Sequence, residues 1–110
     1  MQTVLEKIAS FAVHTDFDQI PADVAAVAKL GLTDFFACSL AGINAPVSKN
    51  ILNYLNIQGL KEGPCRLFGT SHSAGLKEAA LFNGVSSHCM DFDDVSWATI
   101  GHPSVSVAPS

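Results

Sequence analysis

The stretch that decides the fold runs from Ile20 to Gly42 and reads IPADVAAVAKLGLTDFFACSLAG. Pro21 suits the first turn of a helix, because its missing N–H needs no partner there, and Asp23 is well placed near the positive end of the helix dipole. We expect this helix to stop at Gly42, since glycine readily adopts the left-handed backbone that ends helices. Apolar residues lie on nearly every side of the segment between Val24 and Leu40, which predicts a helix buried between other elements.

Other helices are predicted on both sides of this segment. Leu5, Ile8 and Ala9 recur at helical spacing and indicate an amphipathic helix near the amino terminus. Ser73 is the expected N-cap of a later helix. Besides the 20–42 helix, the pattern gives helices at 3–14, 46–59 and 73–88, and one short candidate strand at 65–68. The predicted fold class is therefore all-α, with little or no strand.

Length and composition are consistent with one domain. The chain has 110 residues, of which 48% are hydrophobic, and this proportion is typical of a folded protein rather than a disordered one. The formal net charge is −4 with only six lysine and arginine residues, so we expect no nucleic-acid partner and no anionic membrane surface.

Cysteine usage and hydropathy indicate the cellular compartment in which we expect the protein. The three cysteines are an odd number without paired C-x-x-C spacing, which indicates reduced thiols in a cytoplasmic protein and makes a zinc site built on cysteine a poor candidate. The segment Met1–Lys7 lacks the basic start of a secretory signal. We also expect no membrane span, because no continuous run approaches roughly 20 apolar residues.

Chemistry-bearing residues gather in the last quarter of the chain. His88, Asp91, Asp93 and Asp94 occur within one short segment, and His102 follows shortly after them. Only 15% of the residues in this chain are charged. Such a density of titratable groups indicates a functional site.

The Asp91–Asp94 segment alone admits several interpretations. It lacks the glycine and the distal glutamate of an EF-hand calcium loop. It matches the D-x-D-D string that some terpene cyclases use as a proton donor, and it also fits a solvated acidic segment that closes a helix. His88 suits the end of the preceding helix, where an imidazole stabilises the negative pole. Local sequence leaves these alternatives open.

His102 precedes Pro103, which suits the first position of a new helix. The positive end of that helix disfavours the imidazolium form, whereas a nearby carboxylate favours it. A pairing of His102 with Asp91 would therefore suit the ring for proton transfer. The alternative, a histidine that simply caps a turn before proline, fits the local sequence equally well.

Taken together, these segments resemble the amino-terminal region of the MmgE/PrpD family, which includes 2-methylcitrate dehydratase, cis-aconitate decarboxylase and iminodisuccinate epimerase. The order and spacing of the matching pieces carry the resemblance over practically the whole chain. The pieces are Leu5-x-x-Ile8-Ala9-x-Phe11, Ile20-Pro21, Asp34–Gly42, Phe68-Gly69-Thr70, Ala79–Gly84, His88-x-x-Asp91-Phe92-Asp93-Asp94 and His102-Pro103-Ser104.

The resemblance implies a large all-helical domain, a smaller α+β lid from the rest of the chain, and a homodimer. It implies that Asp91 and His102 line the active site, together with lysine and histidine residues from much later in the sequence. Val95 stands where the family often has threonine, so a hydroxyl contact to substrate would be lost. Besides Asp94, the candidate substrate-binding residues are Ser96 and Thr99. Family enzymes continue for several hundred residues, so we expect residues 1–110 to be an incomplete helical domain without the lid.

The sequence thus predicts the amino-terminal part of a metal-independent lyase or isomerase that acts on a small di- or tricarboxylate. His102 is the candidate proton carrier and Asp91 the residue that orients it, with no cofactor. The chain alone would then be inactive. A first alternative is a non-catalytic helical remnant that serves as an interaction or dimerisation module. A second is a metal site formed by Asp91, Asp93, Asp94 and His102.

Overall fold

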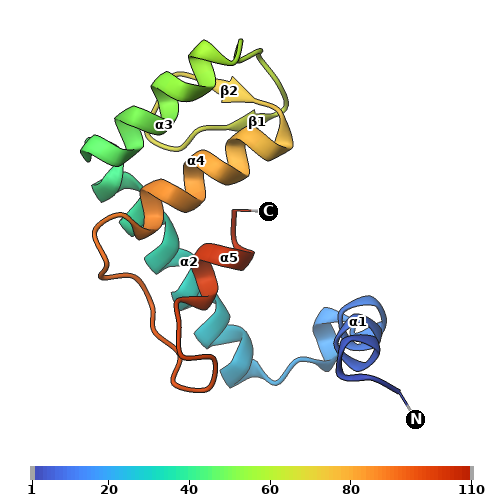
Figure 1. Cartoon of the computed structure of the whole chain (residues 1–110). Helices are drawn as coiled ribbons and strands as arrows, with labels where there is room; N and C mark the ends of the chain where they lie inside the picture. The colour runs from blue at the N-terminus through green and yellow to red at the C-terminus, as the bar shows by residue number, and fades with distance from the viewer. Residues whose placement is uncertain (1, 110) are drawn as a thin grey trace.

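The computed structural model describes residues 2–109. Helices dominate, and one small antiparallel hairpin is present, which confirms the predicted fold class (Figure 1). In chain order the elements are α1 (Val4–His14), the 3₁₀ helix η1 (Phe17–Gln19), α2 (Ala22–Gly42), α3 (Pro46–Ile57), β1 (Cys65–Arg66), β2 (Ser73–Ala74), α4 (Leu76–His88) and α5 (Pro103–Val107).

Helix α4 is the centre of the packing. It contacts α2, α3, α5 and both strands of the hairpin (Figure 1). Its buried Phe82 and Ala79 belong to a core cluster with Leu55 of α3 and Leu67, while Phe35 is buried on α2. This arrangement fixes the end of α4, and hence His88, relative to α2.

Gly42 ends α2 as predicted, but for a different physical reason. Its backbone is helical and is not among the positive-φ residues. A Cβ atom built on Gly42 would overlap the carbonyl oxygen of Ser86 and lie 2.6 Å from Sγ of Cys89. Glycine is therefore required because α2 and α4 approach closely at this point, and not because the chain needs a left-handed residue.

Burial of α2 is less complete than its sequence predicts. Only its carboxyl-terminal half contributes buried residues, namely Phe35, Cys38, Ser39 and Gly42. Val27 and Leu30, near its start, are 68% and 69% exposed. The expectation of a helix buried on nearly every side is wrong for the described part of the chain.

Helix α2 also corrects the expectation about membrane-spanning length. It has 21 residues with a mean hydropathy of 1.5, which is long and apolar enough to cross a membrane. A helix in a protein core can have the same length and composition. Phe35 and Cys38 are buried in the half of α2 that packs against α4, but only 17% of the apolar window is buried within the described residues.

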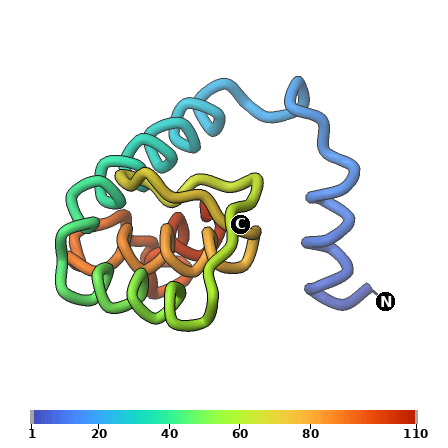
Figure 2. The backbone as a smooth tube through the Cα atoms, turned by 90° about the horizontal axis from the view of Figure 1, so that it is seen from above, coloured from blue at the N-terminus to red at the C-terminus, as the bar shows by residue number. Residues whose placement is uncertain are grey.

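The amino-terminal helix α1 stands apart from the rest of the chain (Figure 2). Thr3 and Glu6 form a capping box at its start, which satisfies two of the free N–H groups there. None of its residues is buried, and Leu5 and Phe11 are 78% and 67% exposed. Its apolar face therefore has no partner among the described residues.

The hairpin is fixed to α4 by one side chain. Asn83 Oδ1 accepts a hydrogen bond from the Phe68 N–H at 2.9 Å, and Asn83 Nδ2 donates to the Arg66 carbonyl at 3.1 Å. Ser73 lies in β2, paired with Arg66, so its predicted role as an N-cap is wrong. The N-cap of α4 is Gly75, which has no side chain to accept a hydrogen bond.

Candidate active site

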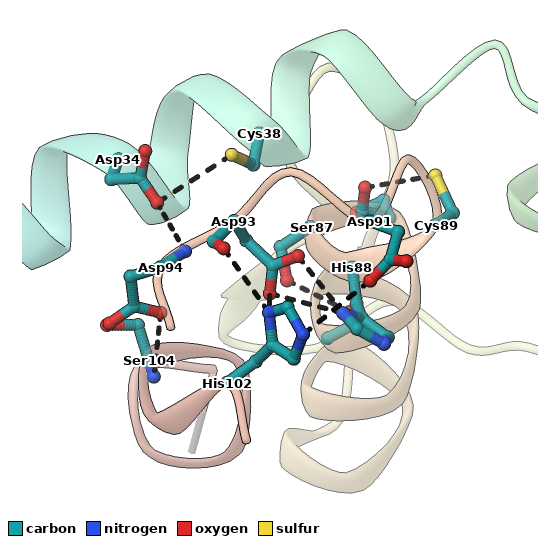
Figure 3. Close-up of polar contacts among 12 residues, drawn as sticks. Asp34, Cys38, Ser87, His88, Cys89, Asp91, Asp93, Asp94, His102 and Ser104 are labelled. Carbon is teal, nitrogen blue, oxygen red and sulfur yellow. Dashed lines mark hydrogen bonds and ion pairs between the residues drawn. The ribbon is translucent and has the colours of Figure 1, made fainter. Parts of the chain in front are cut away.

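The cluster predicted from sequence forms where α4 ends and α5 begins. His88 is the last residue of α4, and His102 is the N-cap of α5, with Pro103 in its first turn as expected. The loop between them carries the three aspartates and passes beside α2 (Figure 3). The fold thereby brings residues from two helix ends and one loop into a single site.

Asp93 lies at the centre of this cluster. Its side chain is 2% exposed and contacts both imidazoles. Nδ1 of His88 is 3.0 Å from Asp93 Oδ1, and Nδ1 of His102 is 3.3 Å from Asp93 Oδ2 and 3.2 Å from the Asp93 carbonyl oxygen. One buried carboxylate therefore holds two histidines, whose rings meet edge to face with centroids 4.6 Å apart.

The second nitrogen of His102 faces Asp91. His102 Nε2 is 3.5 Å from Asp91 Oδ1, so the two side chains that sequence reasoning paired do lie together. Asp91 is 81% exposed at its side chain, whereas His102 is 23% exposed. Asp91 adopts a left-handed backbone with φ 55°, and its N–H donates to the His88 carbonyl at 2.9 Å. The turn after α4 thus aims Asp91 at His102.

These contacts constrain the protons on the rings. A carboxylate and a carbonyl are acceptors only, so Nδ1 of His102 must carry a proton toward Asp93. Nδ1 of His88 is constrained in the same way by the Asp93 carboxylate. Nε2 of His102 is then the ring atom that can lose and regain a proton, and it lies beside the exposed carboxylate of Asp91. This arrangement fits an acid–base role for His102.

Asp94 occupies a different position from its neighbours. Its carboxylate accepts hydrogen bonds from the Ser104 hydroxyl at 2.7 Å and from the Ser104 N–H at 3.2 Å. Its own N–H donates to Asp34 Oδ2 at 3.1 Å. Asp94 therefore fastens the start of α5 and the loop to α2. Its role in binding a substrate stays a prediction.

A family model for the MmgE/PrpD N-terminal domain matches residues 6–110, which include the whole cluster. The chain belongs to the MmgE/PrpD family. It is similar to the cis-aconitate decarboxylase-like protein oryM of Aspergillus oryzae (strain ATCC 42149 / RIB 40), with 28% identity over 107 residues. That alignment covers 97% of this chain and 22% of the relative, so the chain spans about a fifth of the relative's length.

Ser96 and Thr99, the other candidate substrate-binding residues in this MmgE/PrpD domain, lie in the tip of the loop. Ser96 pairs with Gly101 in an isolated antiparallel bridge, and the Thr99 hydroxyl lies 3.5 Å from the Ser96 carbonyl. Trp97 and Ile100 beside them are 90% and 89% exposed. Within residues 2–109, neither Ser96 nor Thr99 makes a side-chain bond to the His88–Asp93–His102 cluster, and their predicted role is untested.

The negative charge of this site extends to α2. Burial raises the pKa of the Cys38 thiol above its ordinary value of 9.0, and the charges of Asp34 and Asp93 raise this pKa further. Cys38 Sγ lies 3.8 Å from Asp34 Oδ2. The thiol therefore holds its proton more tightly than a free cysteine does. The raised pKa of Cys38 shows that the carboxylates of this site act on a residue of α2.

Lysine and arginine make no ion pair with the acids of this site among the described residues. Throughout residues 2–109, all ion pairs formed by the aspartates are with His88 or His102. Lys77 lies at the start of α4, and Arg66 lies beside Asn83, whose side-chain N–H₂ donates to the Arg66 carbonyl. The described part of the MmgE/PrpD domain therefore shows no lysine or arginine paired with this cluster.

Sequence reasoning missed two features of the site. Asp93 was considered only as a possible metal ligand, and His88 only as a residue that stabilises a helix end. Their contact at 3.0 Å depends on the chain turning back after α4. The available signal was the HxxDxDD spacing itself, which places several acids within reach of a helix-terminal histidine, but spacing does not show which acid is buried.

Proposed function

We propose that this chain is the amino-terminal part of a metal-independent lyase or isomerase that moves a proton next to a carboxylate of a small di- or tricarboxylate substrate. The observation that carries the proposal is the position of His102 between Asp93 and Asp91. Membership of the MmgE/PrpD family and the decarboxylase-like name of the Aspergillus relative support this class of reaction.

In the proposed mechanism, Nε2 of His102 takes or returns the proton on the carbon beside the carboxylate. Asp93 orients the ring through Nδ1, much as the buried aspartate orients the histidine in a catalytic triad. Asp91 stabilises the imidazolium that forms, because a negative charge 3.5 Å from Nε2 favours the protonated ring. The enolate-like charge on the substrate requires cations, which other parts of the full-length enzyme must supply.

Substrates such as 2-methylcitrate or cis-aconitate fit this proposal. Dehydration and epimerisation remove a proton beside a carboxylate, whereas decarboxylation delivers one to the carbon that has lost CO₂, so all three include such a proton transfer. A homodimer in the full-length form and a cytoplasmic location belong to the same proposal. The free thiols of Cys38, Cys65 and Cys89 support a reducing compartment. The low number of lysine and arginine residues supports a protein without nucleic-acid or membrane partners.

The test is to assay the full-length enzyme with cis-aconitate and 2-methylcitrate as probes, comparing His102→Ala and Asp91→Asn with His72→Ala as the matched control. His72 is exposed and lies in the hairpin connection, outside the cluster. The proposal predicts a large loss of kcat in the first two variants and none in the control, with full activity in the presence of a chelator. Undiminished turnover of His102→Ala would disprove the catalytic assignment.

A second candidate function is an interaction or dimerisation module. The observation that favours it is α1, which buries none of its residues and exposes apolar side chains such as Leu5 and Phe11. Light scattering on the 110-residue chain tests it. A soluble, folded oligomer of defined mass would support a module, whereas aggregation would indicate that the chain needs the rest of an enzyme.

A further inference from the structure

The His–Asp cluster carries more negative charge than its neighbours neutralise. Asp91 and Asp93 contact the two imidazoles, and Asp34 and Asp94 lie next to them on α2 and the loop. Lysine and arginine form no ion pair with these four carboxylates in the part of the chain that the structure describes. Such a site attracts cations and repels the free anionic substrate.

The donor atoms are also spaced as metal ligands are. One ligand atom from each of His88, Asp91, Asp93 and His102 lies within 4.8 Å of the others. The direct separations are 3.0 Å between His88 Nδ1 and Asp93 Oδ1, 3.3 Å between His102 Nδ1 and Asp93 Oδ2, and 3.5 Å between His102 Nε2 and Asp91 Oδ1. His102 can offer only one of its two nitrogens to an ion. Ligands about 2.0–2.1 Å from a tetrahedral zinc ion are about 3.3 Å apart, so the side chains must close from separations of up to 4.8 Å to enclose one.

From this geometry we propose that His88, His102, Asp91 and Asp93 bind a zinc-class divalent ion in place of the protons they share. Two imidazole nitrogens and two carboxylate oxygens match zinc and similar transition metals better than magnesium or calcium, which prefer oxygen ligands alone. The donor set differs from the one considered from sequence: His88 replaces Asp94, whose carboxylate is engaged by Ser104.

Binding and protonation exclude each other at this cluster. A histidine ligates a metal through a nitrogen that carries no proton, so an imidazole that donates its Nδ1 proton to Asp93 must move that proton to Nε2 or release it before Nδ1 can bind, and no oxidation or reduction is involved. The occupied imidazole of His102 can no longer accept a proton from a substrate. On the proposed function, zinc bound at this cluster is therefore an inhibitor, and the enzyme needs no metal for turnover.

The direct test is calorimetric titration of the protein with Zn²⁺ in two buffers of different ionisation enthalpy. We expect one ion per chain and much weaker binding of Mg²⁺. His88→Ala should weaken Zn²⁺ binding by at least about tenfold, whereas the matched controls His14→Ala and His72→Ala should bind as the parent does. Both control histidines are exposed and lie outside the cluster.

The visible spectrum of the Co²⁺ form of the unmutated protein provides a second measurement that does not depend on how variants fold. Intense tetrahedral bands that Zn²⁺ bleaches stoichiometrically would support the site. Absence of binding to the unmutated protein, or equal affinity in His88→Ala and His72→Ala, would overturn it. Loss of activity on chelation would instead contradict the metal-independent function while leaving the binding result intact.

Discussion

The buried carboxylate of Asp93 lies 3.3 Å from Nδ1 of His102, so it acts on the ring nitrogen that does not face Asp91. An aspartate in this position orients the imidazole and fixes its proton without needing to contact a substrate. The two acids therefore have different roles: the buried Asp93 positions His102, and the exposed Asp91 pairs with the other nitrogen of the ring.

Asp93→Asn tests this division. The amide presents an N–H₂ group as well as an oxygen, so it can face the rings in ways that disturb the proton on Nδ1. We expect kcat of the full-length enzyme to fall by at least about tenfold with a smaller change in KM. Asp18→Asn, at an exposed position in η1, is the control. Nitrogen NMR of the histidine rings should show a changed tautomer distribution, and an unchanged spectrum with full kcat would refute the positioning role.

Gly42→Ala should destabilise the protein, because the added methyl group meets the Ser86 carbonyl where α2 and α4 are closest. We expect the free energy of unfolding, measured with urea, to fall by about 1–3 kcal/mol. Gly84→Ala is a matched helical control: its Cβ would find ordinary contacts at 3.6 Å, and alanine favours helix. Equal stability of the two variants would show that the helices do not approach as described.

Asn83→Ala should loosen the hairpin. It removes the acceptor of the Phe68 N–H and the donor to the Arg66 carbonyl, at a cost of about 1–3 kcal/mol. Amide hydrogen exchange should speed up at Phe68. The control is Asn53→Ala, at an exposed position of α3, which should leave both quantities unchanged. Retained protection of Phe68 in Asn83→Ala would contradict the proposed connection.

The raised pKa of Cys38 predicts low thiol reactivity and a definite pH dependence. In the unfolded chain the thiol ionises at its ordinary value of 9.0, whereas the folded protein holds the proton more tightly. The contribution of Cys38 to stability is therefore complete below that pH and is lost as pH rises through the folded pKa. Native-state alkylation at pH 8, followed by mass spectrometry, should label Cys38 far more slowly than in denaturant. Equal rates would contradict its burial.

The features that the sequence predicts correctly depend on residues that are close together in the chain. Pro103 lies in the first turn of α5 as predicted, because proline fits that position whatever the surroundings are, whereas Pro21 is the N-cap directly before α2. The pairing of His102 with Asp91 could be proposed from sequence because both flank the loop between α4 and α5, which folds back to bring them together. The helix bounds around them needed no knowledge of distant segments.

The features that sequence could not supply depend on contacts between elements distant in the chain. Sequence predicts a left-handed backbone at Gly42, but glycine is required there because of α4, more than forty residues later. Ser73 fits the sequence pattern of an N-cap, but it pairs with Arg66 as part of the hairpin. Asp93 is distinguished from Asp91 and Asp94 only by burial, which depends on how the loop folds between α2 and α5.

The most direct test of His102 as the proton carrier is proton exchange at the substrate carbon. Full-length enzyme is incubated with cis-aconitate or 2-methylcitrate in deuterium oxide, and deuterium uptake beside the carboxylate is measured by mass spectrometry. We predict deuterium uptake with the parent and with His72→Ala, and none above background with His102→Ala. Uptake by His102→Ala at the parent rate would contradict this prediction, because another group would then carry the proton.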